Sequence, residues 1–528
     1  MEFKFRKYFA FGLFIGSSLL PILYAAPVYM PIPNGIAPAL GFGFSSDKSQ
    51  TVERCLNAGI VVYSGSNTGL VDLGKETSLS SVKNYLHIGS EAKIGIGLFS
   101  GGAEFDFYKW VENDSLSETL IYRTNMTFKD SIWTYPESGP LLNPLGEQWV
   151  GTPQFRNVCG DKLIRGMHHS GDLFVALNFR FISHHDREKF DSSFKTSFGS
   201  FASLIAKFNS EVEHLNIAGS IHITAFQQGG DVQYLSQIFG KPDYNNPSPI
   251  SECSFQNPVA CSKVITNILN YTIDADSGFP SQLKVLPGQE YPANAAEYNY
   301  ELADMTNYVK PETPSIVTPE ILDYRTRLGS HFELALTDAS RARFLTQQTV
   351  NPPFVYDDYR GKLSVLQRDL DFNETILQQA GIICFSNPEE CVSQGDATIR
   401  ALKPIDKTLL GLPSQFTVTQ TGSPHGTQAL LFVAKDTSTP RQTFYGVSTN
   451  PNNNYRQNII VSFKFSGADI FMDARDNDSG NLVASYSGRN TGNGIYRGNV
   501  VYHAGDIVSG TGTFTAVLTK SAATMTTY

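Results

Sequence analysis

Two groups of histidines have the side chains that bind transition metals. His168 and His169 are adjacent, and His184, His185 and Asp186 follow further along the chain. Imidazole nitrogens and carboxylate oxygens are common zinc ligands. Adjacent residues of a strand point to opposite faces, however, so such pairs do not easily hold one ion between them. We interpret these residues as surface or strand-end histidines and expect no metal site.

An oxygen-rich stretch near the C-terminus offers a weak calcium candidate. Asp473, Asp476 and Asp478 precede Gly480 in the sequence DARDNDSGN. A full calcium loop of the EF-hand type spans twelve residues and ends in a glutamate, which this stretch lacks. We therefore favour a plain β-turn here.

The sequence carries no motif of a known catalytic site. It contains no Gly-x-Ser-x-Gly nucleophile elbow, no His-Glu-x-x-His zinc motif and no P-loop. Its Asp and Glu pairs show no spacing that selects glycosidase chemistry. The net charge of −9 argues against a general nucleic-acid binder, which would have a basic excess. We expect a protein that is not an enzyme, needs no cofactor and binds no nucleic acid.

The segment from Ser183 to Asn216 fits two secondary structures, of which the first is a helix. Its apolar residues recur at spacings of three and four, and the charged residues stay off this stripe. The stripe consists of Phe190, Phe194, Phe198, Phe201, Ile205, Phe208, Val212 and Leu215. An ordinary amphipathic helix packed on a sheet would have the same pattern.

The second structure is a pair of membrane-spanning strands. Even-numbered positions are mostly apolar and odd-numbered ones mostly polar, as a barrel strand between lipid and lumen requires. Phe201 and Ile205 break the pattern on the odd side, and Ser192, Thr196 and Ser200 break it on the even side. A hairpin turn would also reset the alternation. The candidate membrane-inserting residues are Phe190, Phe194, Phe198, Phe201, Leu204, Ile205 and Phe208.

Length and charge favour strands over a membrane-spanning helix. The 34 residues of the segment suffice for two strands of roughly 9–11 residues joined by a turn. A charge at the centre of a spanning helix costs about 2.5–3.5 kcal/mol on insertion scales, whereas a barrel can turn it toward water.

The N-terminus has the three parts of a signal peptide. Lys4, Arg6 and Lys7 form a basic region, an apolar run from Phe9 to Leu23 follows, and Ala25-Ala26 offers a cleavage site. An uncleaved membrane anchor is the alternative, but the apolar run is short and interrupted by Gly, Ser and Pro. We expect residues 1–26 to be removed and the protein to be secreted.

Six cysteines fit an oxidising compartment. Cys253 with Cys261 and Cys384 with Cys391 are near in sequence and would close short loops. Cys55 and Cys159 remain as the third pair, although six cysteines allow 15 connectivities.

The pattern of elements predicts two domains after the signal peptide. Residues 27–411 mix strands with helices, and residues 412–528 read as a β-sandwich of short alternating strands. Strands are expected at Tyr85–Phe107, Gly171–Ile182 and Ile217–Phe226, and helices at Val264–Tyr271, Pro319–Leu328 and Leu363–Gln379. The class is therefore α+β.

The chain resembles the membrane-attack-complex/perforin (MACPF) family, with a degenerate signature. Cys159-Gly160-Asp161-Lys162-Leu163, six residues, then Ser170-Gly171 resembles the family's aromatic-Gly-Thr/Ser-His-aromatic, six residues, Gly-Gly. Gly160, Gly171 and the spacing are kept, while Asp161, Lys162 and Leu163 depart from it. Leu40-Gly41-Phe42-Gly43-Phe44 is similar to the family's N-terminal Leu-Gly-x-Gly-Tyr, and Gly229-Gly230 looks like its glycine pair at the sheet bend. The likeness covers roughly Pro38–Gly230.

The resemblance implies a bent antiparallel sheet with flanking helical clusters, as in the family and in cholesterol-dependent cytolysins. It implies pore formation by homo-oligomers on a target membrane, with helical clusters refolding into β-hairpins, Gly229 and Gly230 acting as a hinge, and lipids or surface glycans as partners. The second cluster would be Ser183–Asn216, and a first cluster is expected between about Ser100 and Glu147. A MACPF-like binding protein without lytic activity and a secreted hydrolase on a β-rich scaffold are the alternatives.

Overall fold

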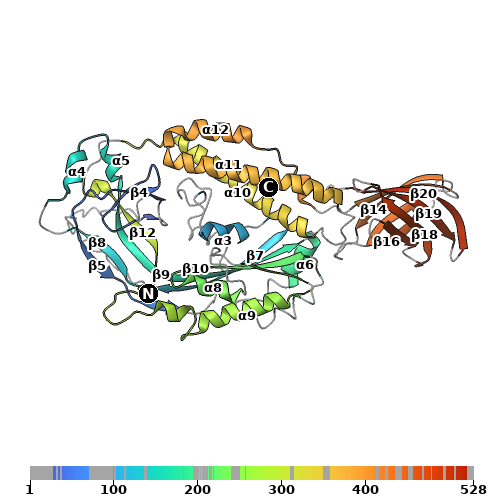
Figure 1. Ribbon diagram of the computed structural model, residues 1–528, viewed down its shortest axis with the longest axis horizontal. Coiled ribbons are helices and arrows are strands. Elements are labelled where there is room, and N and C mark those ends of the chain that lie inside the picture. Colours follow the sequence, from blue (N-terminus) through green and yellow to red (C-terminus); the bar gives the residue numbers. More distant parts are fainter. Residues whose placement is uncertain are drawn as a thin grey trace, which may run out of the picture.

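The computed structural model places a mixed helical and stranded body at one end of the molecule and a β-barrel at the other (Figure 1). The described residues are 28–30, 34–35, 38–70, 99, 103–111, 114–135, 140–181, 184–193, 201, 204, 208, 212, 217, 219–239, 250–255, 257–309, 314–348, 357–411, 415–422, 426–434, 443–449, 456–466, 469–476, 479–491, 495–504 and 507–519. The expected signal peptide lies outside them.

A single long strand, β9 (Lys162–Phe181), organises the body. Its second half pairs antiparallel with β7 (Ser117–Thr127) on one side and β10 (Gly219–Gln228) on the other. Its first half pairs with β8 (Asp130–Thr134) and β12 (Ala296–Asp304). The partners change near Ser170, and Figure 1 shows the sheet turning between these two halves. The strands predicted at Gly171–Ile182 and Ile217–Phe226 are therefore neighbours in one bent sheet.

Burial on both faces explains the composition of β9. From Leu173 to Phe181 every side chain is buried, and the run is rich in Phe, Val and Leu. A strand covered on both faces has no polar alternation, because neither face meets water. The α+β class and the largely antiparallel sheet of the prediction are confirmed.

Shorter strands complete the sheet. At one edge β5 (Ile60–Ser64) pairs with β8, and β6 (Thr68–Leu70) pairs with β7. At the other edge β11 (Ile250–Ser254) pairs with β10. The remaining strands of this sheet are β1 (Val28–Met30), β2 (Asn34–Gly35), β3 (Gly43–Ser45) and β4 (Gln50–Val52). Two short helices, α4 (Pro144–Trp149) and α5 (Phe155–Cys159), precede β9.

Helices cover both faces of the second half of the sheet. A hairpin of two long helices, α10 (Pro319–Gln348) and α11 (Asp357–Ser386), lies over one face with α12 (Cys391–Ala401) (Figure 1). The opposite face carries α8 (Val232–Ile238) and α9 (Val259–Ile273), followed by the 3₁₀ helix η2 (Phe279–Leu283). All three predicted helices are present and longer than expected. Within the described part of the chain, no helix has both the length and the apolarity to span a bilayer.

The C-terminal strands form a closed barrel, so the predicted β-sandwich is wrong. Each strand pairs antiparallel with its sequence neighbour, and the last returns to the first. Short alternating strands and turns are common to both architectures, and only the pairing of the ends separates them. The strands are β13 (Gln415–Gly422), β14 (Gly426–Ala434), β15 (Thr443–Thr449), β16 (Arg456–Ser466), β17 (Asp469–Asp476), β18 (Leu482–Asn490), β19 (Ile495–Ala504) and β20 (Ile507–Thr519).

The three predicted disulfides are all present. Cys55 joins Cys159 across 104 residues, Cys253 joins Cys261, and Cys384 joins Cys391. The first ties the chain ahead of β5 to the end of α5. The second ties β11 to α9, and the third ties the end of α11 to the start of α12.

Candidate functional site

The signature and the N-terminal glycine motif lie side by side. β3 pairs with the start of β9, so that Gly43 faces Leu163 and Phe44 faces Lys162. The Gly41 N–H donates to the Ile164 carbonyl over 2.9 Å. The two sequence elements that carry the family resemblance therefore form one structural unit, 120 residues apart in sequence.

Two glycines of this unit allow backbones to approach closely. A Cβ at Gly43 would lie 2.0 Å from the Cys159 carbonyl oxygen, and one at Gly160 would lie 2.4 Å from that of Phe44. Gly160 also has φ of +79°, which disfavours other residues. These contacts give both glycines a packing role.

The other signature residues hold the same unit together. Asp161 accepts a hydrogen bond from the Ser46 N–H over 2.7 Å and lies 3.4 Å from Arg156. Lys162 is paired with Asp304 of β12, and Leu163 is fully buried. The departures from the family signature thus occupy structural positions in this chain.

The glycine pair predicted as a hinge lies where the sheet turns. Gly229 and Gly230 have φ of +78° and +70°, and a Cβ at Gly229 would lie 2.9 Å from the Ser170 carbonyl oxygen. Beside them the Tyr271 hydroxyl of α9 donates to Gln227 over 2.7 Å and accepts from Gln282 over 3.0 Å. Burial raises the pKa of Tyr271 to about 12, so its hydroxyl stays protonated in this network.

The remaining signature glycine, Gly171, lies on β9 where the sheet turns, near Gly229 and Gly230. A Cβ there would lie 2.1 Å from Leu283 Cδ1 of η2, close to the ring of Phe279. The segment that follows α9 is therefore seated directly on the turn of β9. Whether the turn acts as a hinge stays a prediction.

The second predicted cluster packs against the sheet as helix. It connects β9 to β10 and begins with α6 (His184–Ser193), in which Phe190 is fully buried. Phe201, Leu204, Phe208 and Val212 are also helical and fully buried. They pack with Leu173, Val175, Leu177, Phe179 and Phe181 of β9 in one core. Phe194, Phe198 and Ile205 lie outside the described residues.

A helix lies in the window predicted for the first cluster, but much of that window is strand. Adjacent antiparallel strands β6 and β7 are joined by residues 71–116, and this connection contains α3 (Ala103–Val111). The strands β7 and β8 also fall in this window, although the prediction expected helix there. Part of the stretch predicted as strand, Tyr85–Phe107, is helical in α3. The spacing of its apolar residues fits the period of a helix as well as that of a strand.

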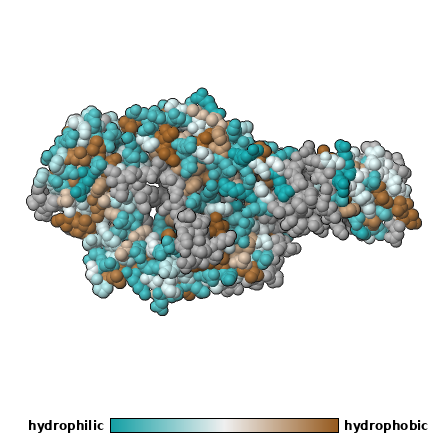
Figure 2. All heavy atoms as spheres, in the orientation of Figure 1, coloured by the Kyte–Doolittle hydropathy of each residue, from teal (hydrophilic) through white to brown (hydrophobic). Residues whose placement is uncertain are grey.

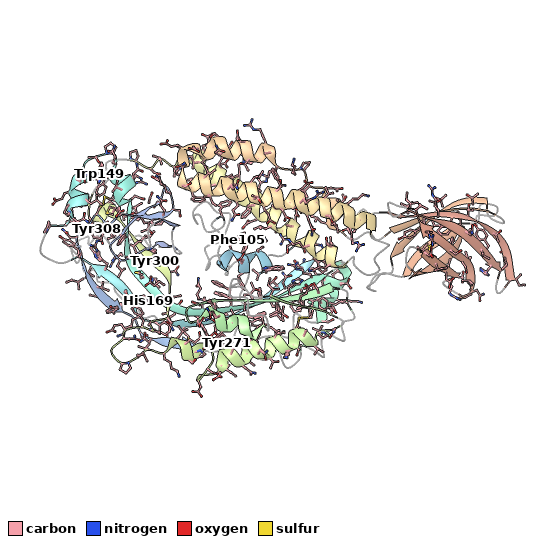
Figure 3. The ribbon with its side chains drawn as sticks, in the orientation of Figure 1. Phe105, Trp149, His169, Tyr271, Tyr300 and Tyr308 are labelled. Atoms are coloured by element: carbon pink, nitrogen blue, oxygen red, sulfur yellow. A yellow bond between two sulfur atoms is a disulfide. The ribbon has the colours of Figure 1, made fainter. Side chains whose placement is uncertain are left out.

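The first cluster packs on the face opposite the second. Phe105, Phe107, Tyr108 and Val111 of α3 are buried with α10 and α11 in a second core. Phe99 stacks on Phe332 at 5.5 Å. Figure 3 shows Phe105 between the sheet and the long helices. Described helical residues therefore lie in the connection between β6 and β7 and in that between β9 and β10.

A buried chain of hydrogen bonds links the end of α3 to α10. Thr119 donates to the Val111 carbonyl over 3.0 Å, Asn178 donates to Thr119 over 2.7 Å, and Arg180 donates to Asn178 over 2.9 Å and to the Ser340 hydroxyl over 2.7 Å. Burial lowers the pKa of Arg180 to about 10, and the guanidinium remains charged. Trp110 of α3 contacts both the Arg180 guanidinium, 5.8 Å from its ring, and the ring of His222, also at 5.8 Å.

The described residues contain no cluster of metal ligands. His168 is paired with Asp130, and His169 with Ser131. His184 and His185 are in α6. Asp476 accepts from the Ser479 N–H over 2.7 Å, as the β-turn interpretation predicts. Asp473 accepts from Ser485 at 3.2 Å, and Asp478 lies outside the described residues.

We expect the fold to lose stability in acid through His169. Its ring is 2 % exposed and lies 3.6 Å from that of Tyr291, and burial lowers its pKa to about 4. The unfolded chain takes up this proton near pH 6.5, whereas the folded ring does so only near pH 4. Stability should therefore fall on the order of 3 kcal/mol between these values from this group and stay constant above pH 6.5.

Denaturant unfolding at pH 7.5, 5.5 and 4 would measure this loss. The substitution His169→Gln should flatten the pH dependence, while His168→Gln, at the partly exposed neighbour, should leave it steep. Equal slopes for the two variants would contradict the assignment to His169.

Comparisons with known proteins give only remote likenesses. No family model and no curated protein matches the chain. Among solved structures, stonustoxin aligns with a TM-score of 0.31 at 8% identity, over 71% of this chain and 45% of that one. A cell invasion protein with a MAC/perforin domain from Bacteroides thetaiotaomicron aligns with a TM-score of 0.21 at 7% identity, over 58% of this chain and 63% of that one.

A third structure is that of Astrotactin-2, described as a vertebrate-specific, perforin-like membrane protein. It aligns with a TM-score of 0.19 at 8% identity, over 84% of this chain and 99% of that one. The chain thus spans less than two thirds of the first two proteins. All three scores lie below 0.5, and inferences about this chain rest on its own geometry.

Proposed function

We propose that this protein is a secreted, MACPF-like pore former without enzymatic activity. It assembles as a homo-oligomer on a target membrane, and both helical clusters refold into β-hairpins that extend the central sheet. The C-terminal domain recognises the target surface. The proposal is supported by the register of the strands from which the two hairpins would grow.

The register of β9 and β10 defines the second hairpin. Phe181 pairs with Gly219 and Asp172 with Gln228, so even-numbered residues always face even-numbered ones. Continued without a bulge, this register pairs Phe198 with Ala202 and leaves residues 199–201 at the turn. Alternation is then preserved across both arms, and Phe201, an exception in the sequence pattern, falls at the tip.

The second hairpin would have one apolar face. Its apolar even-numbered residues lie within 190–198 and 202–212, lengths that match the roughly 9–11 residues of a membrane strand. They are Phe190, Phe194, Phe198, Ala202, Leu204, Ala206, Phe208 and Val212. Most charged residues of these arms are odd-numbered and would face the lumen, where Ile205 is the apolar exception. The apolar face would meet lipid.

The first hairpin follows from β6 and β7 in the same way. Thr68 pairs with Thr127 and Leu70 with Asn125, so even-numbered residues face odd-numbered ones. This register pairs Ile96 with Phe99. One face then carries Leu86, Ile88, Ala92, Ile94 and Ile96 from the first arm and Phe99, Ala103, Phe105, Phe107 and Val111 from the second, with Lys109 as the charged exception. The other face carries charged residues such as Lys93, Glu91, Glu104 and Asp106.

The two apolar faces belong to the same side of the sheet, and this observation carries the proposal. β7 pairs with β9 such that Ser117 faces Arg180 and Ile121 faces Ala176, odd against even. Directly opposite residues project from the same face. The odd-numbered apolar face of the first hairpin is therefore continuous with the even-numbered apolar face of the second. Refolding of both clusters into one barrel wall requires this agreement.

The sheet also offers edges for assembly. All five side chains of β5 are exposed, with Ile60 at 58% and Tyr63 at 47%, and β8 is its one partner strand among the described residues. An exposed apolar edge strand is a template for pairing with another chain. At the opposite edge β11 covers β10. Displacement of β11 would let β10 accept the edge of the next subunit, and ring closure would leave no edge in lipid.

A matched pair of substitutions tests which face meets lipid. Thr196 is even-numbered and Ser197 is odd-numbered, and neither belongs to the helical stripe. We expect Thr196→Lys to place a charge on the lipid face of the first arm, two residues from its end at Phe198, at a cost on the order of 1 kcal/mol per subunit, and to reduce dye release from liposomes. Ser197→Lys should place the same charge in the lumen and preserve release.

Equal activity of the two variants would overturn the hairpin register. Both variants should bind liposomes and form oligomers as the unmodified protein does, because these steps precede insertion. Flotation and native gels would measure them. If the unmodified mature protein releases no dye and forms no oligomer on liposomes of varied composition and pH, the pore-forming proposal fails. A non-lytic binding protein would then remain.

A further inference from the structure

Two buried arginines line a small cavity between α10 and the central sheet. Arg180 belongs to β9 and Arg341 to α10, and the two residues are 5% and 4% exposed. The described lining consists of Asp114, Ser117, Arg180, Thr337, Ser340 and Arg341. The cavity has room for roughly one body of the size of a water molecule. Such a space, lined by charged and polar groups, suits a small polar occupant.

The lining has one more positive charge than negative. Arginine stays protonated in proteins, and Asp114 is the one carboxylate among the described lining residues. Asp114 Oδ2 lies 3.8 Å from Nε of Arg341. Among the described residues, Arg180 has no carboxylate oxygen within 4.0 Å. Because a buried charge without an opposite charge is costly, and because the two guanidinium groups repel each other, the cavity favours an anion over water.

Two further charges act on Arg180, one of each sign, and both have partners of their own. Glu252 of β11 lies 3.1 Å from His222, and Arg343 of α10 lies 3.3 Å from Glu374 of α11. Neither pair neutralises the surplus charge in the cavity. Figure 2 shows mainly hydrophilic, teal atoms where the α10–α11 hairpin approaches the barrel, so that ions from solvent can come close to this region.

Hydroxyl groups add neutral donors to the two guanidinium groups. Ser340 accepts a hydrogen bond from Arg180 over 2.7 Å, and Ser117 accepts one from the Asp114 N–H over 2.7 Å. A hydroxyl that accepts a hydrogen bond keeps its own proton to donate. Both hydroxyls can therefore turn a proton toward an ion that the arginines attract. Sulfate and phosphate are too large for the space, whereas chloride is only slightly larger than water.

We propose that chloride occupies this cavity as a structural ligand of the folded chain. The ion lies between Arg180 and Arg341 and accepts hydrogen bonds from the hydroxyls of Ser117 and Ser340. It joins α10 to β7 and β9, and it stabilises the fold in which α10 covers the sheet. The inference does not depend on pore formation.

Thermal unfolding of the full chain in sodium chloride and in sodium gluconate, at equal ionic strength, tests the ligand. Chloride should raise the Tm in a saturable manner, because it binds the folded chain alone, and bromide should act in the same way. Ser340→Ala removes a donor to the ion and should weaken chloride binding on the order of 10- to 100-fold, as should Ser117→Ala. Arg343→Gln, on the same helix but outside the cavity, should keep the affinity within about twofold.

A second measurement locates the ion directly. Crystals of the unmodified protein soaked in bromide should give an anomalous scattering peak between Arg180 and Arg341. A missing peak, or equal chloride dependence in Ser340→Ala, Ser117→Ala and the unmodified protein, would overturn the proposal. A peak without any chloride dependence of the Tm means binding at crystal concentration only and overturns it as well. Because no vesicle enters either experiment, their failure is distinct from a failure of pore formation.

Discussion

A disulfide between Phe99→Cys and Gly381→Cys should abolish dye release, and mild reduction should restore it. Phe99 belongs to the first cluster, and Gly381 lies on α11, which does not take part in the proposed hairpins. The crosslink would hold the cluster in its helical place, so that the first hairpin could not form. We expect near-complete loss of activity in the oxidised variant, with vesicle binding unchanged.

The geometry at this contact suits a disulfide. A Cβ built on Gly381 would lie 2.3 Å from Phe99 Cγ. Because Cγ is about 1.5 Å from its own Cβ, the two Cβ atoms are at most about 3.8 Å apart, so a small shift of the backbone would bring them to the separation of a disulfide. Both residues face the core formed with α10 and α11.

Controls separate locking from damage. The single substitution Phe99→Cys should keep dye release, since it cannot form the bond. Gly381→Cys alone is not a neutral control, because its Cβ would lie 2.3 Å from the Phe99 ring. The unmodified protein, treated with the same reductant, shows whether the native disulfides tolerate it. Full activity of the oxidised double variant, with the crosslink verified by mass spectrometry, would contradict refolding of the first cluster.

Removal of the Cys55–Cys159 disulfide should cost about 4–5 kcal/mol of unfolding free energy. The bond closes a loop of 104 residues, and in the chain-entropy model the stabilisation grows with loop length. It also fixes Cys159, whose carbonyl oxygen packs against Gly43. Denaturant unfolding of Cys55→Ala with Cys159→Ala, monitored by tryptophan fluorescence, would measure the loss.

The matched control is Cys384→Ala with Cys391→Ala. These cysteines are equally buried but close a loop of only 7 residues, for which the same model gives about 2–3 kcal/mol. Equal losses for the two pairs would mean that lost packing, rather than loop closure, determines the effect.

The sequence was sufficient for elements with a strong local pattern. β9 and β10 are long apolar runs, and α9, α10 and α11 have helical periodicity, so their types were predictable. The cysteine pairs followed from the short loops around Cys261 and Cys391. The glycines at 160 and 171 were found through their spacing, although their role in backbone contacts needed the structure.

Other features depend on strand pairing and tertiary packing, which the local sequence pattern does not determine. The barrel was predicted as a sandwich because only the β13–β20 pairing closes it. The spacing of Phe105 and Phe107 fits a strand as well as a helix, and packing of Phe105 against Phe332 of α10 favours the helix in the folded protein. The agreement of the two hairpin faces was also out of reach, because strand register sets it and a turn could have shifted it.

The clusters start from opposite faces of the sheet, and this asymmetry sets two different routes to one end state. The first cluster rests against Ile121, Phe174 and Ala176, on the side where its apolar hairpin face would also lie. The second rests against Leu173 and Val175, on the other side. In the proposed refolding, the second cluster would have to leave the sheet completely and move round the end of β9 before its phenylalanines could meet lipid, whereas the first could refold on the side where it already lies.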